Sequence, residues 1–441
     1  MPIYEILQVL DKCFIFFPHS LILIDYDGKL EFLLKRYTSF PYDEIPYNIK
    51  NLLDIENSYK KSIKQFKNLN FDIKSDNFIS GAQINTIYEC NMKCKYCFAG
   101  DGSHYKSSKM TLPVAKKIID FIIARASKKE VLPITIIGGE PLMNFETMKF
   151  ILEYGEKISK ETRKNIRFSI TSNGTLIDNT ILETIDDYYV YMMISQDSNQ
   201  KIENDKLRVM KNQKLSQYDI LSEKKKKLLH ANKLRSIHIT VTPKNLYFFE
   251  TAKSFFEEGF FHVHIDLVKS DKKEFLFNKS DISIIIEEFE KLTRYIIHNI
   301  SNDVRVSCFP LMTNLKNLEL RIPKISKCNV LNGLYAFSPD GEIYPCDMLM
   351  WSKYKLGDIN SGFNEDAILD LKQINIKPNK CKYCWARYLC GSLCLADKIN
   401  GNDQTINGDI LCELKKHIIL LQIYIYNYIK DNNPQYINNY I

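Results

Sequence analysis

Short apolar, β-branched segments alternate with longer segments of helical period along the middle of the chain. The segments that favour strands are Ala82–Tyr88, Ile134–Ile137, Ile166–Thr171, Tyr188–Ile194, Ser236–Val241 and Val263–Val268. The segments that favour helices are Thr111–Ser127, Phe145–Lys160, Asp178–Asp187, Ser222–Leu234, Leu246–Glu258 and Ile282–Asn299. Six consecutive strand–helix units are typical of an α/β fold whose parallel sheet curls into an open or closed barrel. In such folds the chemistry gathers on the loops after the carboxyl ends of the strands.

The first eighty residues do not follow this alternation. Residues Phe14–Leu33 are rich in strand-forming side chains and carry a turn signal at Asp27-Gly28, and Asn48–Asn68 has the helical period. The sequence therefore predicts a small α+β module over residues 1–80.

The composition is that of an ordinary globular protein. Of 441 residues, 45% are hydrophobic and 26% are charged, and the length suffices for several domains. The 60 basic and 53 acidic residues leave a net charge of +7, which is too diffuse to demand nucleic acid. No segment reaches the roughly 18 apolar residues of a membrane span, and the N-terminus lacks the basic-then-apolar order of a secretory signal. We therefore expect a cytoplasmic protein without a nucleic-acid or membrane partner.

The twelve cysteines carry the most information about function. Three lie close together at Cys90, Cys94 and Cys97, and eight lie between Cys308 and Cys412. In the reducing cytoplasm, clustered cysteines are more often metal ligands or catalysts than disulfides. The remaining cysteine, Cys13, has no partner nearby in the sequence, and we expect it to be a buried apolar thiol.

The first group follows the first predicted strand with the spacing Cys90-x3-Cys94-x2-Cys97. A structural zinc site needs four ligands, and His104 is the nearest candidate for a fourth. Three thiolates on a [4Fe–4S] cluster instead leave one iron free to bind a small molecule. Gly138-Gly139-Glu140 directly follows the second predicted strand, so we expect both loops on the same rim of the barrel.

The segment CNMKCKYC followed by Phe98 resembles the signature of radical S-adenosylmethionine enzymes. The resemblance implies a partial (βα)6 radical SAM barrel in which Cys90, Cys94 and Cys97 are catalytic and hold a [4Fe–4S] cluster, with Phe98 beside the cofactor. It further implies that the free iron binds the methionyl group of S-adenosylmethionine. One electron then cleaves the sulfonium and releases a 5′-deoxyadenosyl radical that abstracts hydrogen.

The same resemblance implies further contacts to S-adenosylmethionine. Gly138, Gly139 and Glu140 resemble the GGE motif, in which backbone and carboxylate receive the methionyl ammonium. The other implied contacts are Ser172 and Asn173 in the cofactor site, Ser195 at the ribose, Arg208 at the carboxylate and the backbone of Leu267 at adenine. The usual S-L-D-G sequence reads Ser195-Gln196-Asp197-Ser198 here, which puts this loop in doubt. Arg208 as a surface charge and Leu267 as a core leucine are the alternatives.

The second group of cysteines resembles, spacing for spacing, the cysteine-rich SPASM extension of certain radical S-adenosylmethionine enzymes. The resemblance implies two auxiliary [4Fe–4S] clusters, and hence three clusters in all. The implied ligands are Cys328, Cys346 and Cys394 for the first auxiliary cluster, and Cys381, Cys384, Cys390 and Cys412 for the second. Cys308 is a candidate fourth ligand of the first, which otherwise keeps one iron open for a substrate thiolate. Two zinc sites are the alternative, because Cys-x-x-Cys also suits zinc.

These resemblances divide the chain into four parts. They are the small module at 1–80, the radical SAM barrel at 81–300, the SPASM domain at 301–412 and a C-terminal helix at 413–441. Enzymes with a SPASM domain mostly act on peptides or proteins, so the resemblance implies an oxidoreductase with a peptide or protein substrate.

Two enzymatic functions fit. Segments such as CKYCFAGDGSHY and GGEPLMNF resemble maturases of ribosomally made Cys-rich peptides of the sactipeptide and ranthipeptide type, which link a cysteine sulfur to a carbon. The resemblance implies a precursor peptide and an electron donor such as flavodoxin or ferredoxin as partners. The module at 1–80 is similar to domains that hold a leader peptide by strand addition.

The alternative is an anaerobic sulfatase-maturing enzyme, which oxidises cysteine or serine to formylglycine. Residues 340–359 resemble that family, and Asp347 occupies the place of its general base. A carboxylate beside an anionic cluster has a raised pKa, which suits a base near neutrality. A non-enzymatic metal-binding module is a third hypothesis, and iron and zinc analysis separates it from the others.

Overall fold

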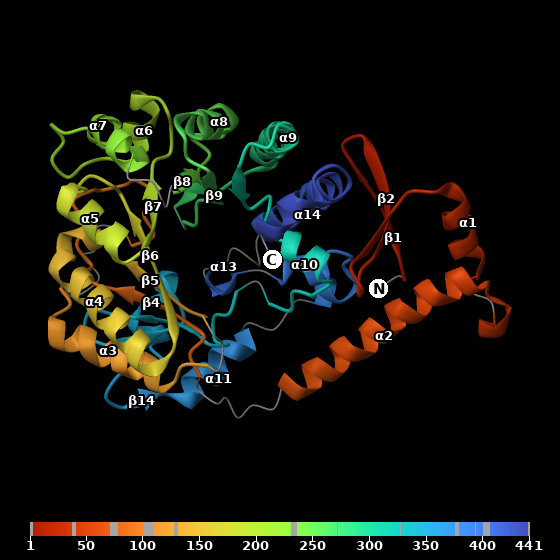
Figure 1. The fold of residues 1–441 in the computed structure, drawn as a ribbon, viewed down its shortest axis with the longest axis horizontal. Helices are drawn as coiled ribbons and strands as arrows, with labels where there is room; N and C mark the ends of the chain where they lie inside the picture. The colour runs from red at the N-terminus through yellow and green to blue at the C-terminus, as the bar shows by residue number, and fades with distance from the viewer. Residues whose placement is uncertain are drawn as a thin grey trace.

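Six parallel strands, in chain order, form the central part of the largest sheet (Figure 1). They are β4 (Gly81–Asn85), β5 (Val131–Ile137), β6 (Asn165–Ser172), β7 (Tyr191–Ser195), β8 (Ser236–Val241) and β9 (His262–Leu267). This computed structural model describes residues 3–37, 41–70, 78–99, 109–127, 131–230, 236–270, 272–326, 328–374, 379–392, 394–399 and 406–439. Each of the six strands hydrogen-bonds in parallel to the next, which confirms the predicted α/β fold with a partial (βα)6 barrel.

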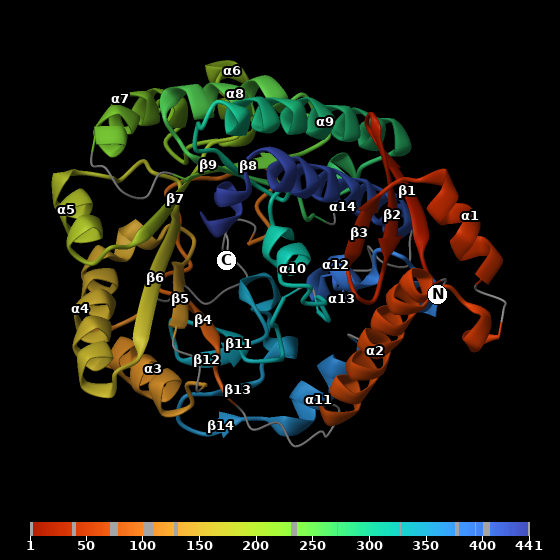
Figure 2. The same cartoon turned by 45° about the vertical axis from the view of Figure 1, so that its right-hand side comes forward.

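Helices cover the outside of this sheet (Figure 2). They are α3 (Leu112–Ala124), α4 (Phe145–Thr162), α5 (Asn179–Asp187), α6 (Lys201–Leu207), α7 (Gln217–His230), α8 (Phe249–Glu258) and α9 (Lys279–Ser301). Ile134 and Ile136 of β5 are fully buried and share a core with Ile118 of α3 and Ile151 of α4. The alternation of apolar runs in the sequence therefore reflects strands that are buried beneath helices.

Side-chain caps determine where several of these helices begin. The Asp178 side chain accepts a hydrogen bond from the backbone of Ile181 at the start of α5. Asn278 and Asp281 form a reciprocal capping box, so α9 begins three residues before the predicted Ile282. Helix α7 begins at Gln217, five residues before the predicted start, and the predicted end at Leu234 lies outside the described residues.

The tail of the chain extends the barrel sheet on both sides, which the sequence did not predict. The added strands are β10 (Ser307–Phe309), β11 (Leu334–Phe337), β12 (Glu342–Tyr344), β13 (Gly357–Asp358) and β14 (Gly362–Phe363). Strand β10 lies parallel to β9, and β11 lies parallel to β4, which gives one 11-stranded sheet. The cysteine-rich tail is thus built onto both edges of the barrel.

The tail also contributes helices. They are α10 (Leu315–Glu319), α11 (Glu365–Ile374), α12 (Arg387–Cys390), α13 (Leu395–Ile399) and α14 (Ile406–Asn432). Helix α14 packs on α9 and includes Cys412, so the C-terminal helix begins before the predicted residue 413. Of the helices in the described part of the chain, none is both long and apolar enough to cross a membrane.

The N-terminal module is a three-stranded antiparallel sheet followed by two helices. Its elements are β1 (Glu5–Val9), β2 (Lys12–Phe17), β3 (Ile22–Asp25), α1 (Gly28–Tyr37) and α2 (Tyr47–Asn70). The predicted β-rich piece at Phe14–Leu33 is wrong beyond Asp25, because Asp27-Gly28 starts a helix and not a hairpin. The Asp27 carboxylate accepts a hydrogen bond from the Lys29 backbone at 2.8 Å, as an N-cap does.

The module contacts the tail through α14. Lys12 of β2 donates to the Asn427 side chain at 2.6 Å, and Tyr424 donates to Asp11 at 2.6 Å. Strand β1 lies against α14, whereas β3 forms the opposite edge of the small sheet.

Candidate functional site

The carboxyl ends of the barrel strands surround a cavity of about 380 Å³. It is lined by every residue for which the sequence predicts a radical-cluster, cofactor or general-base role: Cys90, Cys94, Cys97, Phe98, Gly138, Gly139, Glu140, Ser172, Asn173, Ser195, Arg208, Leu267 and Asp347. The fold therefore assembles in one place residues that are scattered over more than half of the chain. Their individual roles stay predictions. His104, the candidate zinc ligand, lies outside the described residues.

The three-cysteine loop is held against the segment that follows α6. The Lys93 backbone donates to the Val209 carbonyl at 2.6 Å, and the Lys95 backbone donates to the Leu207 carbonyl at 3.0 Å. These bonds use only backbone atoms, so they do not require the lysine side chains at positions 93 and 95.

The thiols of this loop influence one another. Burial raises the pKa of the Cys90 thiol to about 11 and that of Cys94 to about 12, and nearby Cys97 acts in the same direction on both. Three such thiols become thiolates together only when a metal compensates their charge, because coordination deprotonates a thiol. This donor set fits a [4Fe–4S] cluster with three protein ligands.

Gly138 and Gly139, directly after β5, let this loop lie against the segment that precedes Cys90. The Gly139 backbone donates to the Ile87 carbonyl at 2.7 Å, and the Glu140 backbone donates to the Glu89 carbonyl at 2.9 Å. A Cβ atom at Gly139 would lie 2.3 Å from the Glu89 oxygen, which no real side chain tolerates. Only glycine permits this contact between the two loops of the rim.

Glu140 lines the cavity and is buried, with 1% of its surface exposed. Its carboxylate accepts hydrogen bonds from the Asn173 backbone at 2.8 Å, the Ser172 hydroxyl at 2.9 Å and the Leu142 backbone at 3.1 Å. Burial nevertheless raises the pKa of Glu140 to about 7. A carboxylate offers about four acceptor positions, so one remains for a cation in the cavity.

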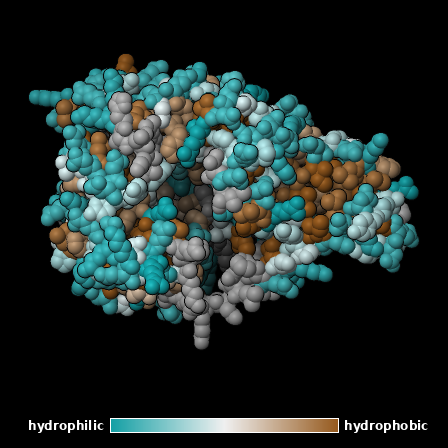
Figure 3. All heavy atoms as spheres, in the orientation of Figure 1, coloured by the Kyte–Doolittle hydropathy of each residue, from teal (hydrophilic) through white to brown (hydrophobic). Residues whose placement is uncertain are grey.

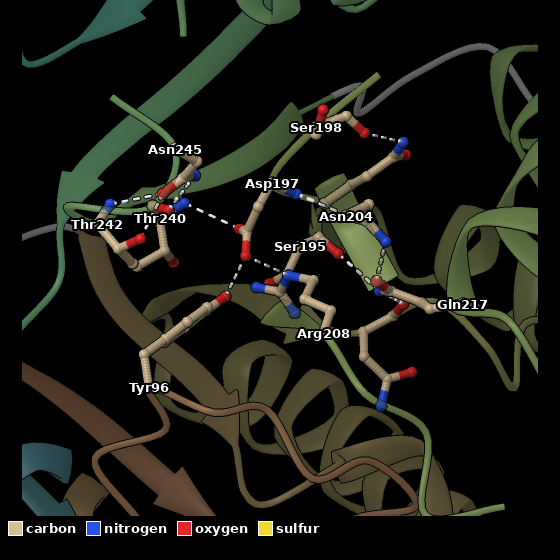
Figure 4. Close-up of polar contacts among 12 residues, drawn as sticks. Tyr96, Ser195, Asp197, Ser198, Asn204, Arg208, Gln217, Thr240, Thr242 and Asn245 are labelled. Carbon is tan, nitrogen blue, oxygen red and sulfur yellow. Dashed lines mark hydrogen bonds and ion pairs between the residues drawn. The ribbon is translucent and has the colours of Figure 1, made fainter. Parts of the chain in front are cut away.

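Arg208 is a buried residue, and the alternative of a surface charge is wrong. It is 6% exposed, and its Nε lies 3.1 Å from the carboxylate of Asp197 (Figure 4). Burial opposes the charge of the guanidinium, but Asp197 outweighs it and raises the pKa of Arg208 above its ordinary value. The loop that departs from S-L-D-G thus keeps its aspartate, which holds Arg208 at the cavity.

Further polar residues around Asp197 were missed by the sequence analysis (Figure 4). The Tyr96 hydroxyl and the Thr240 backbone donate to the Asp197 carboxylate at 2.5 and 3.0 Å. Gln217 donates to the carbonyl oxygens of Asn173 and Ser195, at 2.9 Å each, and so ties the ends of β6 and β7 together. Their spacing in the sequence gives no signal, because Tyr96 lies in the three-cysteine loop, Gln217 at the start of α7 and Thr240 on β8.

Asp347 enters the cavity from the tail and is half-buried there. Burial raises the pKa of Asp347, and the Gln83 amide donates to its carboxylate at 3.2 Å. Lys269 lies nearby and donates toward the sulfur atoms of Met348 and Cys394, at 3.6 Å each. This contact connects the barrel cavity to a predicted ligand of the first auxiliary cluster.

A cluster of two histidines and an aspartate lines the same cavity and was also missed. His238 of β8 lies opposite His264 of β9 in the strand register, and Asp266 follows two residues later. Asp266 Oδ2 lies 3.0 Å from His264 Nε2 and 3.9 Å from His238 Nε2. The alternation His262-x-His264-x-Asp266 was the available signal, because alternate residues of a strand share a face.

Two tail cysteines have other thiols among their electrostatic neighbours, and the two predicted ligand sets stay predictions. Burial raises the pKa of Cys346 well above its usual value, and the neighbouring thiols that contribute are Cys394 and Cys328. Burial likewise raises the pKa of Cys384, whose thiol neighbours are Cys412 and Cys390. Cys381 precedes Cys384 in the same turn, where its carbonyl accepts the Cys384 backbone hydrogen bond at 3.4 Å.

Cys308 and Cys13 lie apart from both sets. Cys308 is 1% exposed on β10 and contacts the Phe309 carbonyl through its sulfur at 3.3 Å. Burial raises its pKa, and among the described residues no other cysteine contributes to that shift. Cys13 lies on β2 and is half-buried, so it is less buried than expected.

Residues 84–219 match the radical SAM superfamily. An uncharacterized protein of Methanocaldococcus jannaschii is 32% identical over 308 residues, which cover 69% of this chain and 94% of that protein. The radical SAM cyclopropyl synthase TigE of Paramaledivibacter caminithermalis is 26% identical over 399 residues, which cover 85% of this chain and 79% of that protein. The cysteine-type anaerobic sulfatase-maturating enzyme of Clostridium novyi is 25% identical over 351 residues, covering 74% and 90%.

Solved structures share the fold. The enzyme anSMEcpe with bound S-adenosylmethionine aligns with a TM-score of 0.68 at 18% identity, covering 79% of this chain and 99% of that one. Streptococcus suis SuiB bound to its precursor peptide SuiA aligns with a TM-score of 0.54 at 15% identity, covering 88% and 93%. This kinship rules out the hypothesis of a non-enzymatic metal-binding module. The chain belongs to the radical SAM superfamily, and it is an enzyme that uses S-adenosylmethionine and a [4Fe–4S] cluster.

Proposed function

We propose that this enzyme matures a ribosomally made precursor peptide by joining a cysteine sulfur to a carbon of another residue. The observation that carries this proposal is the composition of the barrel cavity. The three-cysteine loop lines one side, and Asp347 and Met348, which follow the tail residue Cys346, line another. A peptide side chain in this cavity lies between the two groups of cysteines. SuiB, which was solved with its precursor peptide, supports a peptide as the substrate.

The proposed reaction sets requirements that the residues of the cavity meet. Making a thioether from a thiol and a C–H bond removes one hydrogen atom, one proton and one electron from the peptide. S-adenosylmethionine and its cluster, when bound, supply the radical that takes the hydrogen atom. Asp347 is the proton acceptor in this proposal, because burial raises its pKa and makes its carboxylate more basic.

The electron passes, in this proposal, to the cysteine-rich tail. Cys328, Cys346 and Cys394 would hold one auxiliary [4Fe–4S] cluster, and Cys381, Cys384, Cys390 and Cys412 the other, which makes three clusters in all. Support comes from the thiol neighbours found for Cys346 and Cys384. A carrier such as flavodoxin or ferredoxin supplies the reducing electron.

The N-terminal module is the proposed binding site for the leader of the precursor peptide. Strand β3 is an edge of its sheet, and an extended peptide can add to such an edge by backbone hydrogen bonds. Figure 3 shows apolar side chains gathered over this module, where Ile6, Tyr26 and Phe32 are exposed. These side chains offer contacts to apolar residues of a leader.

Formylglycine formation on a sulfatase is the second candidate function. The position of Asp347 in the cavity and its raised pKa support it equally, because that reaction also needs a base near the substrate carbon. The kinship to the Clostridium novyi enzyme points the same way. The N-terminal module favours the first candidate, because leader recognition gives that module a purpose.

Mass spectrometry of two anaerobic reactions separates the two functions. Each contains the reconstituted enzyme, S-adenosylmethionine and dithionite; one contains the Cys-rich peptide encoded beside this protein and the other a sulfatase-type peptide. We expect the first peptide to lose two hydrogens and one alkylatable thiol. Conversion of the second peptide's cysteine to an aldehyde, with loss of sulfur, would instead establish sulfatase maturation.

Two controls sharpen this experiment. The Cys94→Ala enzyme should form neither product and no 5′-deoxyadenosine, which shows that the reaction requires the three-cysteine loop. The Cys-rich peptide without its leader should react more slowly if the module holds the leader. Equal rates with and without the leader would remove that role from the module and leave the chemistry untouched.

A further inference from the structure

The cluster of His238, His264 and Asp266 has the geometry of a metal site. The three side chains come from two neighbouring strands, and one potential ligand atom from each lies within 4.8 Å of the other two. Zinc–nitrogen and zinc–oxygen bonds are about 2.0–2.2 Å long, so two ligands of one ion lie at most about 4.3 Å apart. The separations of 3.0 and 3.9 Å to Asp266 already satisfy this limit.

The surroundings hold these side chains in place. The ring of His264 stacks on Phe309 of β10 with 4.1 Å between ring centroids and an interplanar angle of 6°. The His238 ring packs edge-on against the His264 ring, with 5.1 Å between the ring centroids. Because both rings belong to paired strands, a ligand that drew them together by a few tenths of an ångström would not distort the sheet.

Their chemistry also suits a cation. Burial and the adjacent His264 lower the pKa of His238 to about 3, so this imidazole is neutral and has a free lone pair. Burial opposes ionisation of Asp266, but the His264 hydrogen bond outweighs it and, with the charge of nearby Lys269, lowers the pKa of Asp266 below its usual range. Two imidazoles and one carboxylate are a common ligand set for zinc and for iron(II).

The permanent cations near this cluster form their direct contacts with other groups, although the charge of Lys269 also acts on Asp266. Arg208 pairs with Asp197 at 3.1 Å, and the hydrogen bonds of Lys269 go to the sulfur atoms of Met348 and Cys394. In the described part of the chain, both ion-pair contacts of Asp266 within 4.0 Å are with histidines. No lysine or arginine of the described segments therefore lies within 4.0 Å of the Asp266 carboxylate.

We propose that His238, His264 and Asp266 bind one divalent transition-metal ion, zinc or iron(II), whose remaining coordination positions face the barrel cavity. Three protein ligands leave at least one position open, as in catalytic metal sites. An ion there acts as a Lewis acid, to which a thiolate or carbonyl oxygen of the substrate can coordinate. This site is distinct from the cysteine-bound clusters and does not depend on which peptide is modified.

Manganese(II) is the probe for this site, because carboxylate-containing sites accept it and thiolates prefer softer metals. The oxidised enzyme with its clusters in place is titrated with Mn²⁺ while the EPR signal of free Mn²⁺ is followed. We expect one site per chain in the wild type and at least a tenfold weaker site in His264→Gln and Asp266→Asn. His262→Gln is the matched control, because His262 lies on the same strand but bonds to Ser307 at 3.0 Å.

Absence of a stoichiometric site in the wild type would overturn the proposal. Equal Mn²⁺ affinity in His264→Gln and His262→Gln would overturn it as well, since the ion would then bind elsewhere. Iron content and melting temperature show whether each variant is folded with its clusters. If His264→Gln is not, His238→Asn replaces it, and elemental analysis of the native enzyme for zinc decides independently.

Discussion

Gln83 forms two hydrogen bonds with Asp347, although 264 positions separate them in the sequence. The Gln83 amide donates to the Asp347 carboxylate at 3.2 Å, and its oxygen accepts the Asp347 backbone N–H at 3.0 Å. A residue of the first barrel strand thus positions the carboxylate that the tail contributes. The barrel cavity and the proposed base consequently move as one unit.

Replacing Asp347 with Asn should separate radical formation from product formation. The amide keeps the shape of the side chain but cannot accept the proton, and loss of a general base typically costs a factor of about 10² to 10⁴ in rate. We expect product formation to fall by about that factor while 5′-deoxyadenosine is still released; both are quantified by mass spectrometry in one reaction. Asp340→Asn, which changes an exposed carboxylate of the same tail segment, should behave as wild type. Full product formation by Asp347→Asn would assign the proton to another group.

The affinity for S-adenosylmethionine should fall as the pH decreases from 8 to 6. The pKa of Glu140, raised by burial to about 7, lies above the ordinary carboxyl value, so the side chain becomes protonated within this range. A neutral Glu140 no longer attracts the methionyl ammonium. Calorimetric titration at both pH values measures the effect. Glu140→Gln should bind weakly with little pH dependence, and an equal slope in both proteins would exclude Glu140 as the titrating group.

Breaking the pair of Asp197 and Arg208 should destabilise the fold. Asp197→Asn leaves a buried guanidinium without its counter-charge, and such a loss costs about 3–5 kcal/mol. Urea unfolding of the cluster-loaded protein measures this change. Glu203→Gln, which removes an exposed ion pair of 3.9 Å with Lys206, should cost at most about 1 kcal/mol. A similar loss of unfolding free energy in both variants would mean that the buried pair stabilises the fold no more than the exposed pair does.

Cys308→Ala should leave the iron content unchanged. Cys308 lies in an apolar core on β10, and no other described cysteine contributes to the shift of its pKa. Three cubane clusters contain about twelve irons, and Cys346→Ala should lose about four of them. Iron analysis of anaerobically reconstituted protein gives both values. A loss of iron in Cys308→Ala would make Cys308 the fourth ligand of the first auxiliary cluster.

The sequence predicted the barrel because its strands are short segments with apolar side chains at alternate positions, as in Ile166–Thr171, where Phe168 and Ile170 are buried. It could not predict the strands of the tail, because a two-residue strand such as Gly357–Asp358 has no periodicity. The sequence analysis placed a turn at Asp27-Gly28. An Asp-Gly pair can also start a helix, so the pair by itself could not distinguish the two. Functional residues were likewise predictable only where the sequence has a regular pattern. The fixed spacing of Cys90 and the two cysteines after it is such a pattern. The alternation of His264 and Asp266 was visible in the sequence, but their partner His238 comes from the neighbouring strand and joins them through the strand register.

The pairing of β11 with β4 also has a consequence for the synthesis of the chain. Strand β4 begins at residue 81 and β11 at residue 334, so 253 residues are translated between them. At about 5–20 residues per second, this takes about 13–50 s. Throughout that time the nascent barrel presents a bare strand edge, the kind of surface on which chains aggregate. Production of this enzyme should therefore benefit from chaperones that shield the ribosome-bound barrel until the tail emerges.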